Sequence, residues 1–364
     1  MDKIEEQIKK IEDEIRKTPY HKATERHIGL LRAKLSKLKD AQIEKSSKKS
    51  GGGISFAVKK HGDGTVVFVG PPSAGKSTLL NKLTNAKSKV APYAFTTLTV
   101  IPGMMDHKDA RIQILDVPGL IEGAEEGKGR GREVLSVVRG ANLLILMTDV
   151  DREKQMDNIK ETLERNGIRI NKTPPKVSIK KKISGGISII SNIKQALDKG
   201  TIKDIAKEFR LPNAEITIKQ KLTLEDLVDT FARNRVYIPT LFVINKVDQL
   251  SNKDMENKLN SDKVYRRNIS ATKGTGLEEL KDAIWEALGF VRVYLVRADE
   301  EPSDKNPMIM KSGQALSDVA MKIGEEFAEG KTHAKIWGSG AKYRGQEVGL
   351  TKKIEEGMQV RFVS

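Results

Sequence analysis

The sequence contains no cysteine, few aromatic residues and no long uninterrupted apolar run. Without cysteine the chain can form neither a disulfide framework nor a thiolate metal site, and it has no thiol nucleophile. Aromatic residues make up only 5% of the chain, which argues against a dedicated surface for stacking single-stranded bases. The longest apolar runs, at 143–147 and 241–244, have the length of strands, so we expect no membrane span. The polar start offers no signal peptide, and a reducing, cytoplasmic location fits the missing cysteines.

The charge of the chain is strongly positive. Lysine and arginine total 65 against 49 acidic residues in 364, which gives a formal net charge of +16. This excess favours a polyanionic partner, because each phosphate neutralised by a basic side chain releases a bound counterion. A solvated, lysine-rich surface of the kind found in thermophiles is the alternative.

The apolar pattern divides the chain into blocks. Residues 1–50 predict a helical hairpin, with isoleucines at helical spacing (Ile4, Ile8, Ile11, Ile15), a break at 18–20 and a second apolar run at 28–38. A Ser/Lys/Gly linker is expected at 46–53. Short apolar strands then alternate with helices that begin near Gly75, Gly131, Arg152 and Leu277. The expected strands are 66–69, 111–115, 143–148, 240–244 and 264–269. This alternation predicts an α/β fold with a doubly wound sheet.

Two further blocks accompany this sheet. The segment 167–235 predicts an inserted α+β subdomain, with a hairpin at 183–188, a helix at 202–209, a strand at 215–219 and a helix capped by Thr223. The last block predicts four strands, at 291–296, 308–310, 334–337 and 360–363, around one helix at 315–326, which suggests a β-grasp fold. The expected domains are 1–50, a first segment of the doubly wound sheet domain at 62–166, the insert at 167–235, a second segment of the sheet domain at 236–290 and the β-grasp domain at 291–364.

A phosphate-binding loop follows the first strand of the sheet. The pattern G-x-x-x-x-G-K-[ST] is matched in full by Gly70, Pro71, Pro72, Ser73, Ala74, Gly75, Lys76 and Ser77. The glycines allow backbone N–H groups to approach phosphates, and the following helix directs its positive end toward them. We expect Lys76 to reach the β- and γ-phosphates and Ser77 to ligate Mg²⁺.

Two further segments complete the predicted phosphate end. Asp116, Val117, Pro118 and Gly119 follow a strand, where Asp116 would hold Mg²⁺ through a water and the Gly119 N–H would contact the γ-phosphate. Upstream lie Phe95, Thr96 and Thr97. One threonine there is expected to reach Mg²⁺ and the γ-phosphate, with Thr97 favoured over Thr96. Phe95 belongs to the same segment, where packing is its expected role.

The selectivity for guanine is predicted from a third motif. Asn245, Lys246 and Asp248 follow a buried strand, and the Asp248 carboxylate can accept hydrogen bonds from guanine N1–H and N2, a pair that adenine does not offer. Lys246 can lie along the base, and Asn245 can tie this loop to the phosphate loop. After the last strand, Ser270, Ala271 and Thr272 are expected to bring backbone N–H groups to guanine O6.

Together these motifs resemble the Obg–Drg branch of GTPases, through the runs 70–80, 95–99 and 116–124. The flanking blocks resemble the developmentally regulated GTP-binding proteins (Drg) over nearly the whole chain. The resemblance implies a slow GTPase that uses Mg²⁺, a C-terminal TGS domain linked to RNA, and an insert similar to a domain of a small-subunit ribosomal protein. The resemblance also implies the ribosome, rRNA or tRNA as partners. It further implies a stabilising protein partner of the kind that the eukaryotic members of the family bind. We expect a monomer.

The predicted catalytic group is incomplete. Lys76, Thr97 and Gly119 are the expected catalytic residues, but Leu120 stands where many GTPases carry the glutamine that orients the attacking water. Ser73 is a candidate K⁺ ligand, in place of the asparagine found in related K⁺-dependent enzymes. The rival to a GTP-hydrolysing switch is a GTP-gated scaffold with negligible turnover until a partner supplies catalytic groups. An ATPase and a DNA-binding protein are further alternatives.

Basic clusters in the insert are candidates for an RNA contact, as are Lys335, Lys342, Tyr343 and Arg344 in the last block. Lys180, Lys181 and Lys182 precede the expected Gly-Gly turn, and Lys219 and Lys221 follow a strand. The alternative is that these lysines protect exposed strand edges from pairing with other chains.

Overall fold

The computed structural model describes residues 3–49, 61–84, 91–92, 99–117, 130–232, 234–250 and 266–364. They form two compact units, each built from two stretches of the chain. The first unit comprises Met1–Ala57 and Lys160–Ile238, and the second comprises Val58–Ile159 and Pro239–Ser364. Within the described ranges, no helix combines the length and apolar character needed to cross a membrane.

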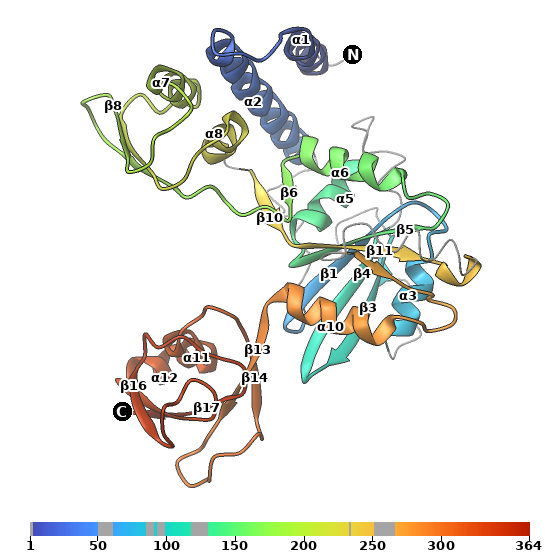
Figure 1. Ribbon diagram of the computed structural model, residues 1–364, viewed down its shortest axis with the longest axis vertical. Helices are drawn as coiled ribbons and strands as arrows, with labels where there is room; N and C mark the ends of the chain where they lie inside the picture. The colour runs from blue at the N-terminus through green and yellow to red at the C-terminus, as the bar shows by residue number, and fades with distance from the viewer. Residues whose placement is uncertain are drawn as a thin grey trace. The chain divides into compact units, whose positions relative to one another are not determined.

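The second unit contains a seven-stranded sheet (Figure 1). Its strands are β1 (Gly64–Val69), β2 (Ala91–Pro92), β3 (Thr99–His107), β4 (Ala110–Asp116), β5 (Leu143–Asp149), β11 (Thr240–Asn245) and β12 (Arg266–Asn268). The strand order is β12-β11-β5-β1-β4-β3-β2, with parallel pairing from β12 to β4 and antiparallel pairing at the β3 and β2 edge. Every residue of β1 and β5 is buried, as expected for strands covered on both faces. The predicted α/β architecture is confirmed.

Helices connect these strands. They are α3 (Lys76–Leu83), α5 (Arg130–Arg139), α6 (Gln155–Arg165), α10 (Leu277–Leu288) and the short 3₁₀ helix η1 (Val247–Gln249). Three of the four predicted starts agree within one residue. The fourth is wrong by three residues, because Arg152 lies in a turn that follows β5 and α6 begins only at Gln155. Side chains such as Phe68, Leu79 and Ile145 form the main core of this unit.

The sheet positions a crevice at the end of β1. β4 pairs with one edge of β1, and β5, the next strand of this sheet along the chain, pairs with the other edge. The strand order therefore reverses at β1. In open α/β sheets, ligands bind at the carboxyl ends of the strands where the order reverses in this way. The described residues that directly follow β1, β4, β5 and β11 therefore lie at this edge.

The C-terminal block of the second unit has a sheet of its own. Its elements are β13 (Phe290–Leu295), β14 (Pro307–Lys311), α11 (Leu316–Ile323), α12 (Glu325–Glu329), β15 (His333–Trp337), β16 (Gln346–Gly349) and β17 (Met358–Val363). The order is β14-β13-β17-β15-β16. The prediction of four strands and one helix is wrong in two details. The short β16 completes the sheet beside β15, and the helix breaks at Gly324, whose extended backbone separates α11 from α12.

The first unit combines the N-terminal hairpin with the insert. Its elements are α1 (Lys3–Lys17), α2 (Glu25–Lys49), β6 (Ile168–Ile170), β7 (Val177–Lys181), β8 (Ile187–Ser191), α7 (Lys199–Glu208), β9 (Ala214–Ile218), α8 (Leu224–Phe231) and β10 (Val236–Ile238). The predicted linker from 46 is wrong at its start, because α2 continues to Lys49; residues 50–60 lie outside the described ranges. Thr223 caps α8 in a capping box with Asp226, as predicted.

Helix α2 packs on the insert through apolar contacts and ion pairs. Ile28 belongs to the same core as Ile205 of α7, and a Cβ on Gly29 would lie 2.8 Å from the Ile205 side chain, so α2 approaches α7 closely. Lys37 of α2 bonds Glu208 at 2.8 Å. The hairpin and the insert therefore share one hydrophobic core.

The expected hairpin at 183–188 is wrong. β7 and β8 do not pair with each other, because β9 lies between them, antiparallel to β7 and parallel to β8. Gly185 and Gly186 do form the turn, with φ of 94° and 72°. Asn213, just before β9, accepts from the Gly186 N–H at 2.8 Å and donates to the Ile183 carbonyl at 3.1 Å. These two hydrogen bonds attach the turn to the residue before β9, the strand that lies between β7 and β8.

Candidate functional site

The loop between β1 and α3 requires its two glycines. A Cβ on Gly70 would lie 2.0 Å from the Met147 carbonyl oxygen, so the loop passes directly over β5. Gly75 has φ of +92°, and a Cβ there would lie 2.2 Å from Nδ2 of Asn245. No other residue fits either position without displacing its neighbours. Helix α3 then begins at Lys76, and its free N–H groups form an anion-binding end.

Lys76 folds back over this loop. Its Nζ donates to the carbonyl oxygens of Gly70 at 3.0 Å and Pro71 at 2.9 Å. Burial lowers the pKa of Lys76, while the charge of Asp116 opposes that shift. The ammonium group is thus held at the mouth of the loop by two neutral carbonyl groups.

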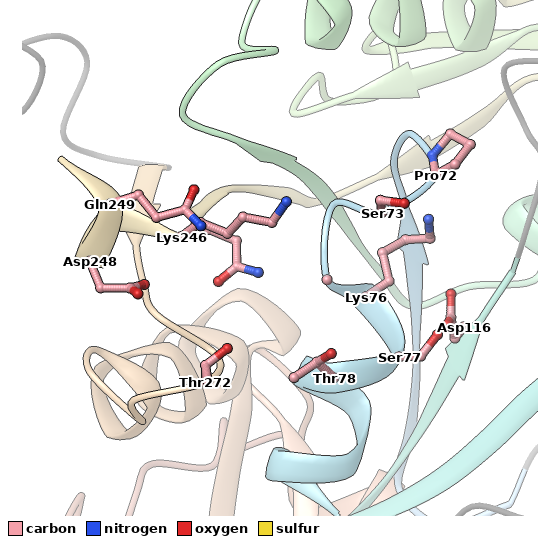
Figure 2. A pocket seen from close by; sticks show the side chains of 12 residues that line it. Pro72, Ser73, Lys76, Ser77, Thr78, Asp116, Lys246, Asp248, Gln249 and Thr272 are labelled. Atoms are coloured by element: carbon pink, nitrogen blue, oxygen red, sulfur yellow. Dashed lines mark hydrogen bonds between the residues drawn. The ribbon is translucent and has the colours of Figure 1, made fainter.

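Two oxygen donors meet at one end of the pocket. The Ser77 hydroxyl donates to Oδ2 of Asp116 at 2.5 Å, and Figure 2 shows the two side chains together. Oδ1 of Asp116 is buried and has no hydrogen-bond partner among the described residues. A buried carboxylate oxygen without a partner is costly unless a cation or water satisfies it. This pair has the hard oxygen ligands that Mg²⁺ prefers.

Asn245 joins three loops. Its Nδ2 donates to the Ala74 carbonyl oxygen at 2.9 Å, and its Oδ1 accepts from the Ala271 N–H at 2.9 Å. The side chain is 3% exposed, so both bonds are protected from water. The geometry agrees with the expectation that Asn245 ties its own loop to the phosphate loop, and adds the 270–272 loop to that connection.

Asp248 lies at the opposite end of the pocket, near Thr272 (Figure 2). A hydrogen bond from Ser270 lowers the pKa of Asp248, so the side chain is a carboxylate at neutral pH. The Val247 N–H donates to the Ile269 carbonyl oxygen at 3.2 Å, which holds η1 against the last strand segment. An ionised acceptor therefore lines the pocket from a short helix whose first residue is hydrogen-bonded to Ile269.

Sequence reasoning missed a charged link between the two ends. Asp149, at the end of β5, accepts from Arg152 Nη2 at 2.6 Å and from Lys246 Nζ at 3.1 Å. Arg152 also donates to the Pro72 carbonyl oxygen at 2.7 Å. The sequence offered one signal for Asp149: like Asp116 and Asn245, it is a polar residue at the end of a buried strand.

The loop after β1, the start of α3, the last residue of β4 and the segment at the end of β11, together with Thr272, surround a pocket of about 480 Å³. Its lining consists of Pro72, Ser73, Gly75, Lys76, Ser77, Thr78, Asp116, Asn245, Lys246, Asp248, Gln249 and Thr272. Thr78 and Gln249 were not predicted. Six predicted residues are buried and do not line the pocket: Gly70, Pro71, Ala74, Val117, Ser270 and Ala271. The positions outside the described residues are Phe95, Thr96, Thr97, Pro118, Gly119 and Leu120.

A glycine-bounded phosphate loop, a serine–aspartate oxygen pair and an Asn-Lys-x-Asp loop, all at the carboxyl edge of a doubly wound sheet, define a P-loop protein of the GTPase class. Models of known protein families match three consecutive segments of the chain. Residues 65–181 match one described as "50S ribosome-binding GTPase", residues 184–290 match the C-terminal region of the MMR_HSR1 domain, and residues 291–364 match the TGS domain.

Full-length relatives identify the family. An uncharacterized GTP-binding protein of Methanocaldococcus jannaschii is 47% identical, covering 97% of this chain and 91% of its own length. Developmentally-regulated GTP-binding protein 1 of Xenopus laevis is 40% identical and covers 98% of both chains. Ribosome-interacting GTPase 1 of Saccharomyces cerevisiae is also 40% identical, over 96% of each. The chain belongs to the developmentally regulated GTP-binding protein family.

Proposed function

We propose that this GTP-binding protein hydrolyses GTP slowly to GDP and phosphate, with Mg²⁺ at its phosphate end, and acts as a switch at ribosomes. The observation that carries the proposal is the pocket itself. It has a phosphate-loop lysine and an oxygen pair at one end and an ionised carboxylate, Asp248, at the other.

The phosphate end suggests a division of roles. Lys76 would exchange its two carbonyl contacts for the β- and γ-phosphates, and the N–H groups of residues 73–77 would surround them. Ser77 and Asp116 would hold Mg²⁺, because their oxygens adjoin and one of them has no other partner among the described residues. When bound, Mg²⁺ neutralises charge that develops on the phosphate oxygens. We assign Thr97 and the Gly119 N–H to the same group from their sequence motifs.

The base end would select guanine. Asp248 accepts from the base, while Lys246, held by Asp149, lies beside it. In a competition assay with fluorescent GDP, we expect GTP to displace the probe and ATP to fail. Asp248→Asn should weaken GDP binding by about tenfold or more, because one charge-assisted acceptor is lost. Equal displacement by ATP and GTP would contradict the guanine assignment.

The metal assignment has its own test. Ser77→Ala should weaken GTP binding in the presence of Mg²⁺, because one oxygen ligand is removed. With EDTA, the wild type and the variant should bind GTP equally. A defect of the same size with and without Mg²⁺ would place the role of Ser77 outside metal binding.

Slow turnover is proposed from Leu120, which cannot orient a water through a hydrogen bond. We also propose that K⁺ near Ser73 accelerates hydrolysis. Single-turnover hydrolysis should be slow in NaCl and faster in KCl at the same ionic strength. Equal rates in the two salts refute the K⁺ proposal, whereas no hydrolysis by the isolated chain favours the alternative of a GTP-gated scaffold that depends on a partner.

The ribosomal role draws on the basic charge and on the name of the yeast relative, a ribosome-interacting GTPase. Partners would include the ribosome, through rRNA or tRNA, and a stabilising protein, with the chain itself monomeric and cytoplasmic. Cosedimentation with ribosomes should be stronger with a non-hydrolysable GTP analogue than with GDP. Equal sedimentation in both states would contradict a nucleotide switch.

A further inference from the structure

The three-stranded sheet of the first unit has two different faces. One face supplies Ile187, Ile216 and Ile218 to the core shared with α7 and α8. Side chains alternate along the strands, so the neighbouring positions belong to the other face. There, Ser178, Lys180 and Ser188 are exposed, and Ile190 is 51% exposed. We call this surface the open sheet face.

The register aligns the open sheet face into rows. Ser178, Thr217 and Ile190 lie opposite one another across the three strands. Lys180, Glu215 and Ser188 form the next row. The face therefore presents hydroxyl groups and lysines on adjacent strands, with Ile190 as a single apolar side chain.

Charges are distributed unevenly between the two sides of the insert. The acidic residues of α7 face the N-terminal hairpin, where Asp204 bonds Arg26 at 2.6 Å and Glu208 bonds Lys37 at 2.8 Å. On the open sheet face, Glu215 is the acidic residue, and it bonds Lys182 at 3.0 Å.

The other lysines of this face form no ion pair within the described ranges, although Lys180 lies opposite Glu215 and its charge helps to lower the pKa of that carboxyl group. Alternation along the strands puts Lys176, Lys180 and Lys219 on it, and within the described ranges no carboxylate comes within ion-pair distance of any of the three. Between Lys176, just before β7, and Lys180 within it, the four-residue interval corresponds to roughly 13 Å of extended chain. This is the length of several nucleotides in a duplex, which carries a phosphate about every 3.4 Å along each strand.

The chemistry of the face favours a duplex over other polyanions. It has no aromatic side chain on which unpaired bases could stack. Its hydroxyl groups can pair with 2′-hydroxyls, which line the wide, shallow minor groove of an RNA helix. A protein partner would require a larger apolar centre than one isoleucine.

We propose that the open sheet face docks double-stranded RNA, contacting phosphates through Lys176, Lys180 and Lys219 and 2′-hydroxyls through the hydroxyl row. This inference rests on the proposed ribosomal role and names the chemistry of the partner.

The test measures binding of the full chain to a labelled 20-base-pair RNA duplex by fluorescence anisotropy at several salt concentrations. Replacing Lys176, Lys180 and Lys219 together with glutamine should weaken binding more than roughly tenfold and reduce the salt slope by about 3, one for each phosphate contact. The control replaces three exposed lysines elsewhere in the first unit, Lys9, Lys34 and Lys203, with glutamine. It should bind like the wild type.

A variant of opposite sign strengthens the test. Glu215→Gln removes the acidic residue of the face and releases Lys182, so duplex binding should become several-fold tighter. A DNA duplex of the same sequence should bind more weakly than the RNA. Equal losses in both lysine variants, tighter binding of single-stranded RNA, or binding of an acidic peptide in place of the duplex would overturn the inference.

The ribosomal role is tested separately. If the triple variant of Lys176, Lys180 and Lys219 loses duplex binding yet still cosediments with ribosomes in a GTP-dependent manner, the ribosomal role stands, and the open sheet face is not the surface that contacts the ribosome. If the wild type binds duplex RNA but shows no nucleotide-dependent cosedimentation, the switch proposal fails and the RNA surface stands.

Discussion

The link from Asp149 to the two ends of the pocket gives a quantitative prediction for Asp149→Asn. Asparagine has nearly the same volume as aspartate, so the substitution leaves packing intact and removes the charge. Arg152 and Lys246 then lose the carboxylate that holds them, and an amide N–H₂ can face their donors instead of an acceptor. The phosphate loop should lose its Arg152 anchor at the Pro72 carbonyl oxygen.

The magnitude follows from the titration of this carboxyl group. Hydrogen bonds from Arg152, opposed by burial and assisted by Lys246, lower the pKa of Asp149 from 3.8 to about 2. Each unit corresponds to ~1.4 kcal/mol, so the charged interactions contribute roughly 2 kcal/mol. Because the pKa is depressed in the folded state, this contribution is complete above pH ~4 and is lost as the pH falls toward about 2. Asp149→Asn removes it at neutral pH.

The assay is the dissociation rate of fluorescent GDP, measured beside the melting temperature. If the loss occurs entirely in binding, roughly 2 kcal/mol corresponds to about thirtyfold faster dissociation. Asp151→Asn is the matched control, because Asp151 is exposed and only two residues away. An unchanged dissociation rate and melting temperature in Asp149→Asn, or an equal effect in the control, would refute the reasoning.

Two other substitutions test the close approach of the phosphate loop at Gly75 and an ion-pair network inside the first unit. Gly75→Ala would force a Cβ within 2.2 Å of Asn245 Nδ2 at a φ of +92°, so we expect fluorescent GDP binding to fall at least tenfold; normal binding would contradict this close approach of the loop to Asn245. Asp229→Ala removes the carboxylate that bonds both the buried Arg169 and the half-buried Arg235, and leaves them only the longer ion pairs with Glu225 at 3.8 Å and Asp40 at 3.7 Å. The substitution should destabilise the first unit by about 3 kcal/mol in chemical denaturation. A loss below about 1 kcal/mol would show that water replaces this network.

The fold and the core of the site were predictable from sequence because their signals are local. A buried strand followed by Gly70–Ser77 needs only a few consecutive residues to define a phosphate loop. The capping box at Thr223 is equally local, since its two hydrogen bonds span three residues. Strand and helix periods likewise extend over single elements, so the doubly wound sheet could be predicted.

Tertiary structure alone decided which distant groups meet. β9 separates β7 from β8, although a Gly-Gly turn joins those two strands and local geometry would permit a hairpin. The link from Asp149 to Lys246 crosses 97 positions of sequence. The sequence by itself determined the chemical groups at each strand end. The pairing of those groups depended on strand order, because only the assembled sheet brings the ends of β1, β4, β5 and β11 to one edge.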